Sequence, residues 1–162
     1  MKSALRFFFL LALSTWLGSL LFFGVVAYVA FIVLPTTHEA GLLVGTSLRH
    51  LHVIGLVCGL VLLITQLLLR PQGRRRAFAA GLVLTAVMIA LTVISQFAII
   101  PAMDQHRARI GSTVDLNSVA PDNPDRVAFD QLHVYSTWVE DGVLVAALAL
   151  LALASLSPRH EA

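Results

Sequence analysis

Four long apolar runs dominate this chain of 162 residues. They cover residues 7–34, 51–69, 77–100 and 132–156. A transmembrane helix needs about 20 mostly apolar residues, because that length spans a hydrocarbon core of about 30 Å. The first run contains no charged residue, and His52 and Gln66 are the main polar interruptions of the second. The sequence therefore predicts an all-α protein, a four-transmembrane-helix bundle that forms one domain over residues 1–162.

The composition agrees with a lipid environment. Hydrophobic residues make up 58% of the chain and charged residues 12%, whereas soluble domains average about 25% charged. The basic residues lie in short segments between apolar runs, not on one face with aromatic readers, so we expect no nucleic-acid partner. The single cysteine, Cys58, excludes an intramolecular disulfide. The expected partner is the lipid bilayer, with other membrane subunits as a further possibility.

The first apolar run resembles a signal peptide because a basic segment precedes it. However, the apolar region of a signal peptide is about 7–15 residues long, and this run extends from residue 7 to residue 34. We therefore expect a retained helix.

The flanking basic residues predict the orientation, because cytoplasmic flanks are enriched in lysine and arginine. With both termini inside (N-in/C-in), seven basic residues lie on the inner side: Lys2, Arg6, Arg70, Arg74, Arg75, Arg76 and Arg159. Four lie outside: Arg49, Arg107, Arg109 and Arg126. Residues 70–76 form a tight basic turn in this prediction. We expect a multi-pass protein of the bacterial cytoplasmic membrane.

Residues 101–126 are the predicted outer loop. Residues 103–110 could form a helical turn at the interface, and residues 36–48 are expected to be partly helical. Near the end of the loop, Asp122, Asn123, Pro124 and Asp125 are typical of a turn and cap that lead into the fourth helix.

Small and polar residues within the runs predict how the helices pack. Gly55 and Gly59 form a GxxxG pattern, and Gly142 and Ala146 a similar pair. Small residues let helices approach closely in lipid, and we interpret these pairs as intramolecular contacts. Other polar side chains within the runs are expected to form hydrogen bonds between helices: Gln66, Gln96, Ser14, Thr15 and Ser19.

Given this topology, most groups able to bind a metal or move a proton share one membrane face. Five of the six histidines lie there: His38, His50, His52, His106 and His133. The nearby acids are Glu39, Asp104, Asp130, Glu140 and Asp141.

The fourth run places acids inside the nominal membrane core. Glu140 and Asp141 lie in its outer third, where a carboxylate is costly unless it is paired, hydrated or protonated. His133 shares a helix face with Glu140, two turns away, and with Asp130, three residues away. We expect Arg49 or a histidine of the second helix to pair with Glu140. Arg49, Asp130, Glu140 and Asp141 are therefore the candidates for ion pairing or proton transfer.

Imidazole groups also suggest a metal or haem site, since they are ligands for copper, zinc and iron. His52 and His133 are the candidate cofactor ligands, and the candidate metal set is His50, His52, His133 and Glu140. His50 and His52 are two residues apart, so on a regular helix at most one of them faces the interior.

Three other interpretations stay open. The histidines and acids could simply be hydrated at the interface, or Glu140 and Asp141 could serve a carrier of a small solute or proton. The chain could also be a structural subunit of a membrane complex. No nucleophile elbow, phosphate loop or dinucleotide motif is present, so we expect a binding or assembly module and no enzyme.

Several short motifs resemble the bacterial family called domain of unknown function 4149, which is related to the eukaryotic transmembrane protein 205. They are Trp16-Leu-Gly18, residues 40–45, residues 100–103 with Arg107, and Phe129-x-x-Leu132-His133-x-x-Ser136. The resemblance implies a four-helix membrane protein and no known activity. The acidic Glu140 and Asp141 depart from the neutral position that is usual there.

Overall fold

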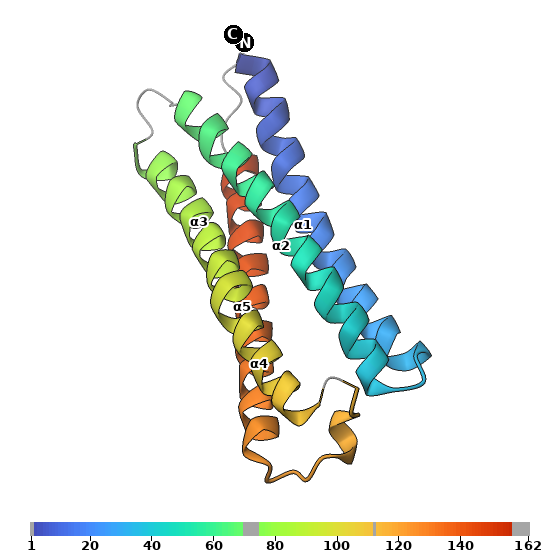
Figure 1. Ribbon diagram of the computed structural model, residues 1–162. Coiled ribbons are helices and arrows are strands. Elements are labelled where there is room, and N and C mark those ends of the chain that lie inside the picture. The colour runs from blue at the N-terminus through green and yellow to red at the C-terminus, as the bar shows by residue number, and fades with distance from the viewer. Residues whose placement is uncertain (1, 70–74, 112, 157–162) are drawn as a thin grey trace.

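The computed structural model describes residues 2–69, 75–111 and 113–156, and within these ranges every regular element is a helix (Figure 1). The elements are α1 (Lys2–Val33), α2 (Thr37–Leu68), α3 (Arg75–Ile94), the π-helix η1 (Ser95–Ile99), α4 (Ile100–Ile110), the short 3-10 helix η2 (Leu116–Ser118) and α5 (Pro124–Ser155). α3, η1 and α4 follow one another without a break. Together with α1, α2 and α5, this long helix gives four helices of sufficient length and apolarity to cross a membrane. The predicted all-α fold, with four helices long and apolar enough to span a membrane, is confirmed for the described residues.

The helices form two closely packed pairs. α1 lies along α2, and α5 lies along α3 and α4. The two pairs meet mainly through α2 and α3, whereas α1 has little contact with α5. The start of α1 and the end of α5 lie at the same end of the bundle, and the segment between α4 and α5 lies at the other end (Figure 1).

The second helix is longer than its apolar run. α2 begins at Thr37, because the Thr36 hydroxyl accepts a hydrogen bond from the backbone N–H of Glu39 at 3.1 Å and so caps the first turn. Of residues 36–48, predicted to be partly helical, Thr36 is the cap and residues 37–48 form the first turns of α2. The helix therefore begins well before the predicted span of 51–69.

The segment between α4 and α5 is shorter than the predicted loop of residues 101–126. α4 continues to Ile110 and ends at Gly111, whose φ of 112° suits glycine. The predicted cap of the last helix is confirmed, since the Asn123 side chain accepts hydrogen bonds from the N–H groups of Asp125 and Arg126. Of the predicted basic turn at 70–76, residues 70–74 lie outside the described residues.

The core at the middle of α1 is tightly packed around Trp16, which is 1% exposed. A Cβ on Gly55 would lie 2.7 Å from the indole Nε1 of Trp16, and one on Gly59 would lie 2.7 Å from Ile89. These distances leave no room for a side chain. The GxxxG pair of α2 therefore packs against α1 and α3 of the same chain, as predicted.

Buried polar side chains also join helices in this region. The Gln66 amide donates to the Thr85 hydroxyl at 2.7 Å, which links α2 to α3. Gly81 allows this approach, because a Cβ there would lie 2.7 Å from Gln66 Oε1. The prediction for Ser14 was wrong. Its hydroxyl donates to the carbonyls of Leu10 and Leu11 in its own helix, where a serine can satisfy itself without a partner helix.

Candidate functional site

A buried histidine joins three helices at the centre of the bundle. His52 on α2 is 1% exposed, and both of its ring nitrogens have side-chain partners. Nδ1 lies 2.8 Å from Oε1 of Gln96, and Nε2 lies 2.7 Å from Oε1 of Glu140 on α5. The hydroxyl of Ser95 donates to the same Glu140 oxygen at 3.3 Å. We call His52, Gln96, Glu140 and Ser95 the polar cluster.

The π-helix η1 explains how neighbouring residues reach two different helices. Pro101 has no N–H, and in a regular helix its ring would clash with the carbonyl four residues earlier. The chain widens just before it, and the N–H of Ile100 bonds to the carbonyl of Ser95, five residues back. Within this widened turn Ser95 points to α5 and Gln96 points to α2. The proline therefore shapes the helix that supplies half of the polar cluster.

The hydrogen-bond partners of His52 hold its ring between two helices. Gln96 and Glu140 each lie within hydrogen-bond distance of one ring nitrogen, and an imidazole nitrogen donates or accepts according to its tautomer. Because the amide of Gln96 has both a donor and an acceptor, it can pair with Nδ1 in either role. The polar cluster can therefore keep both hydrogen bonds in more than one arrangement of its hydrogens.

Next to the polar cluster lies a pocket of about 650 Å³ between the α1–α2 pair and α5. Its polar lining comes mainly from α5: Arg126, Asp130, His133, Ser136, Thr137, Glu140 and Asp141. Its apolar lining comes mainly from α1, α2 and two residues of α5: Leu20, Leu21, Phe23, Phe31, Val44, Leu48, Phe129 and Leu144. The pocket exists because α1 has little contact with α5. Its volume falls within the range of small-molecule sites, about 300–1,000 Å³.

Glu140 belongs to both the pocket and the polar cluster. Its side chain is 13% exposed, and it lines the pocket while Oε1 bonds to His52 and Ser95. Among the described residues, none donates a hydrogen bond to its second oxygen. Asp141, the next residue, also lines the pocket. A ligand in the pocket could therefore reach both carboxylates.

A set of contacts between α2, α4 and η2 lies at the outer end of the pocket. Arg107 donates through Nη2 to the Val114 carbonyl and lies 2.7 Å from Nδ1 of His38. The Thr37 hydroxyl donates to Asp115 at 2.7 Å. This hydrogen bond, followed by the one from the Asn117 N–H, lowers the pKa of Asp115 below its usual value. We call these contacts the clasp. Thr37 of the clasp lines the pocket, and so do Leu116 and Asn117 of η2.

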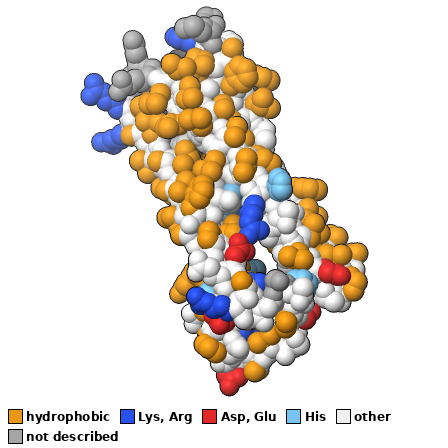
Figure 2. Space-filling view, in the orientation of Figure 1, with side chains coloured by type: hydrophobic (Ala, Val, Ile, Leu, Met, Phe, Trp, Pro, Cys, Tyr) orange, Lys and Arg blue, Asp and Glu red, His pale blue; other side chains and the backbone are white. Residues whose placement is uncertain are grey.

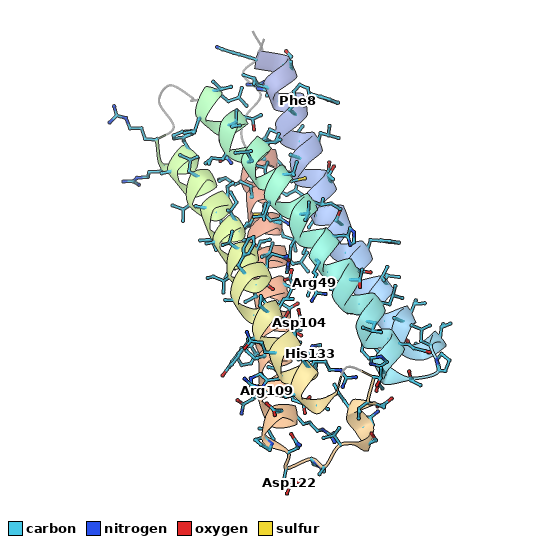
Figure 3. The ribbon with its side chains drawn as sticks, in the orientation of Figure 1. Phe8, Arg49, Asp104, Arg109, Asp122 and His133 are labelled. Carbon is cyan, nitrogen blue, oxygen red and sulfur yellow. The ribbon has the colours of Figure 1, made fainter. Side chains whose placement is uncertain are left out.

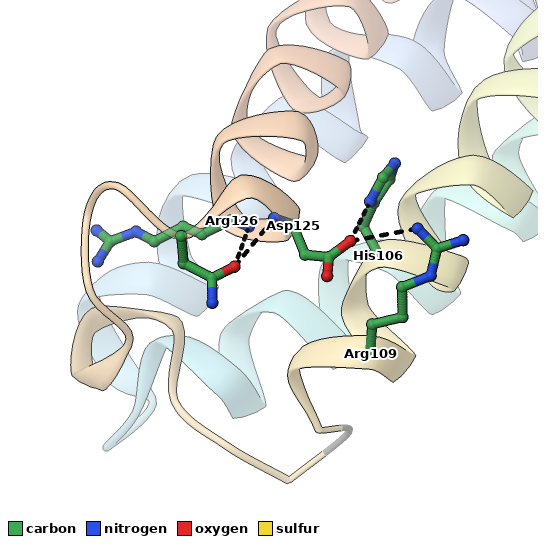
Figure 4. Close-up of polar contacts among 5 residues, drawn as sticks. His106, Arg109, Asp125 and Arg126 are labelled. Carbon is green, nitrogen blue, oxygen red and sulfur yellow. Dashed lines mark hydrogen bonds and ion pairs between the residues drawn. The ribbon is translucent and has the colours of Figure 1, made fainter.

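A second group of charges holds the start of α5 against α4 (Figure 4). Asp125 lies 2.8 Å from His106 Nδ1 and 3.3 Å from Arg109. Arg126 lies 3.8 Å from Asp130 and donates to the Val119 carbonyl. Figure 2 shows that charged and histidine side chains gather over this half of the visible face, whereas hydrophobic side chains cover most of the other half.

The structure brings together some of the predicted residues. Glu140 pairs with His52, as expected for a histidine of the second helix. Arg49, the other expected partner, instead lies 2.5 Å from Asp104 of α4, which it faces in Figure 3. Asp130 pairs with Arg126.

Only two of the four predicted metal ligands contact each other in the structure. His52 and Glu140 meet, but both nitrogens of His52 are engaged. His50 points away from the interior, as its spacing from His52 predicts. It is exposed, and its Nδ1 bonds to the Thr46 carbonyl. His133 lines the pocket. Among the described residues, no three His, Cys, Asp or Glu side chains form a group that could hold a metal ion.

The pattern of one known family, Domain of unknown function (DUF4149), matches residues 11–111. The chain belongs to this family. The DUF4149 match covers most of α1 and all of α2, α3, η1 and α4, and so includes His52, Ser95 and Gln96. The motif of Phe129 to Ser136 and the acids of α5 lie beyond the matched range. No curated protein and no solved structure matches the chain.

The part that η1 plays in the polar cluster was not predicted from the sequence. Gln96 was expected only to join helices, and Ser95 was not singled out. The signal available was Pro101 directly after an apolar run that contains adjacent Ser95 and Gln96. A proline at that position predicts a helix irregularity, which often marks functional sites.

Proposed function

We propose that this DUF4149 protein is a membrane binding module that takes a small molecule into the pocket between the α1–α2 pair and α5. The observation that carries this proposal is the junction of the pocket with the buried polar cluster. A largely apolar cavity with a few convergent polar groups is the usual form of a ligand site. Glu140 presents such a group to the pocket, and His52, Ser95 and Gln96 fix its position.

The cellular setting is part of the proposal. The basic flanks favour both termini in the cytoplasm of a bacterium, with the pocket toward the outer face of the cytoplasmic membrane. We propose a non-catalytic role, since Ser95, the hydroxyl of the polar cluster, is fully buried beside Glu140 and is not among the residues that line the pocket. A relation to the eukaryotic transmembrane protein 205 is likewise proposed from the resemblance of the motifs.

Native mass spectrometry of the protein released from its own membrane tests the binding function. We expect adducts of small-molecule mass on the wild type and at least a threefold loss in Gly24→Leu. Gly24 lines the pocket on α1, and a Cβ there meets nothing within 4 Å, so leucine fills the pocket without a clash.

Gly18→Leu is the matched control. Gly18 lies on α1 and also has nothing within 4 Å of an added Cβ, but it is not among the pocket residues. Equal adduct levels in the wild type and Gly24→Leu, or no adduct on either, would contradict the binding function.

A carrier of a small solute or proton is the second candidate. The contact between Glu140 and the imidazole of His52 favours it, because both side chains can carry a proton and Glu140 also lines the pocket. In liposomes, Glu140→Gln should abolish a pH-dependent flux, while Asp104→Asn, outside the pocket, should leave it intact. A flux unchanged by Glu140→Gln would remove this residue from the mechanism.

A metal or haem ligand and a purely structural role are supported less well. A metal at His52 would have to displace Gln96 or Glu140, each of which lies within hydrogen-bond distance of a ring nitrogen. A structural subunit would need a fixed membrane partner. Co-purification of such a partner at constant stoichiometry, with no small-molecule adduct, would favour the structural role over the binding role.

A further inference from the structure

We propose that the ligand of the pocket is an organic amine, protonated at neutral pH, with an apolar or aromatic body. This inference rests on the proposed binding function and names the class of molecule that the pocket accepts. It is argued from the charges of the pocket lining, from their place along α5 and from the opposite apolar wall.

The pocket lining contains three carboxyl groups and one guanidinium. The carboxyl groups belong to Asp130, Glu140 and Asp141 and the guanidinium to Arg126, and His133 adds an imidazole. Arg126 already lies 3.8 Å from Asp130 and donates to a backbone carbonyl. Arg49 lies near the pocket wall but is paired with Asp104 at 2.5 Å. The positive charges are therefore satisfied within the protein.

Asp141 is the carboxylate that lacks a partner. No described residue forms a hydrogen bond or ion pair with its side chain. The apolar residues 142–156 that follow it rise about 22 Å at about 1.5 Å per residue, which is less than a hydrocarbon core of about 30 Å. Asp141 therefore lies at a depth where a lone carboxylate is costly. A cation in the pocket would supply the missing charge.

Glu140 adds a second acceptor for the same cation. Its Oε1 is held by the polar cluster, and its other oxygen has no donor among the described residues. An ammonium group has three hydrogens to donate and no acceptor. It can therefore satisfy Asp141 and Glu140 together, whereas a carboxylate or phosphate would be repelled by both.

The opposite wall suits an apolar body rather than a bare cation. It contains the rings of Phe23 and Phe31 on α1 together with leucines of α1 and α2, and Phe129 of α5 adds a third aromatic ring to the pocket lining. Aromatic faces attract organic cations as well as apolar groups. A pocket of about 650 Å³ is also much larger than a hydrated inorganic ion requires.

Three probes with one body and different head groups test the inference: 4-phenylbutylamine, 4-phenylbutan-1-ol and 4-phenylbutanoate. Binding to the full chain in nanodiscs of neutral lipid is measured by calorimetry at pH 7, with empty nanodiscs subtracted. We expect saturable binding of the amine at least tenfold tighter than of the alcohol, and none of the carboxylate. Asp141→Asn should weaken the amine at least tenfold and leave the alcohol unchanged, since only the amine uses the charge.

Two variants separate this inference from the binding function. Asp104→Asn removes a carboxylate outside the pocket and should leave amine binding unchanged, whereas Gly24→Leu should abolish binding of both amine and alcohol. Equal binding of amine and alcohol, tighter binding of the carboxylate, or no effect of Asp141→Asn would overturn the amine assignment. The binding function would survive these results if Gly24→Leu still removed the bound probe. No saturable amine binding would also overturn the assignment, and the adducts seen by native mass spectrometry would then decide the binding function alone.

Discussion

The two halves of the bundle differ in how closely the same four helices pack. In the half that runs from Trp16, at the middle of α1, to the start of that helix, which we call the closed half, Trp16, Gly55 and Gly59 bring the helices into direct contact. In the half near the clasp, the open half, α1 separates from α5 and leaves the pocket. In the closed half, small residues allow the helices to pack without a gap. In the open half, polar side chains line the gap between the helices.

The glycines show this difference most directly. A Cβ on Gly55 would meet the Trp16 ring at 2.7 Å, but a Cβ on Gly24 or Gly41 would meet nothing within 4 Å. Both Gly24 and Gly41 line the pocket. The same residue type therefore marks close contact in one half and open space in the other.

The largest expected effect comes from adding a side chain to the closed half. Gly55→Leu should destabilise the protein by about 3 kcal/mol, since a well-packed interior tolerates added volume poorly. Gly41→Leu in the open half should change stability by less than about 0.5 kcal/mol. Unfolding of both variants in mixed detergent micelles measures the difference. Similar losses from the two substitutions would contradict the division into closed and open halves.

Much of this division could be predicted from sequence, and the reasons are local. The four spans follow from residue type and length, and the GxxxG pair of α2 predicts a close contact. The pairing of Glu140 with a histidine of α2 could be predicted because a carboxylate at that depth needs a partner. The pocket could not, because it depends on how far α1 diverges from α5. The distance between α1 and α5 depends on packing between segments that are far apart in the sequence. No single residue or local motif predicts it.

The second prediction concerns the polar groups of each half. His52→Ala should cost about 2 kcal/mol, because it leaves Gln96 and Glu140 without their buried partner and opens a cavity. Thr85→Val in the closed half should cost only about 0.6 kcal/mol, a typical value for a hydrogen bond between membrane helices. Gln66 keeps its bond to the Leu62 carbonyl in that variant. Equal costs in the same micelle assay would show that the polar cluster is no more important than an ordinary interhelical bond.

The third prediction concerns the clasp and pH. The hydrogen bond from Thr37 lowers the pKa of Asp115 in the folded protein, so the ionised carboxylate is the stabilising form. Its contribution is complete above the pKa of the unfolded chain, about 3.8, and is lost as pH falls through the lower folded value. Amide exchange of residues 113–119, corrected for intrinsic rates, should be constant from pH 7 to 5 and rise below about pH 4.

Substitution at Asp115 should mimic that loss. Asp115→Asn should raise the exchange of residues 113–119 at pH 7, and Asp122→Asn, at an exposed position of the same segment, should not. If both variants exchange like the wild type, Asp115 does not hold the outer end of the pocket, and the open half is shaped by its helices alone.

The smallest effect is expected at the Arg49–Asp104 pair, which links α2 to α4 beside the pocket. Its side chains are 41% and 60% exposed, and exposed ion pairs are worth about 0.2–1 kcal/mol because water and salt screen them. Asp104→Asn should therefore cost less than about 0.5 kcal/mol in the micelle assay and still less in 1 M salt. A cost near that of His52→Ala would mean that surface charge holds the two helix pairs at their separation. If the cost is small, the buried polar cluster is the main polar link between the helices of the open half. In that cluster His52 of α2 contacts both Gln96 of η1 and Glu140 of α5.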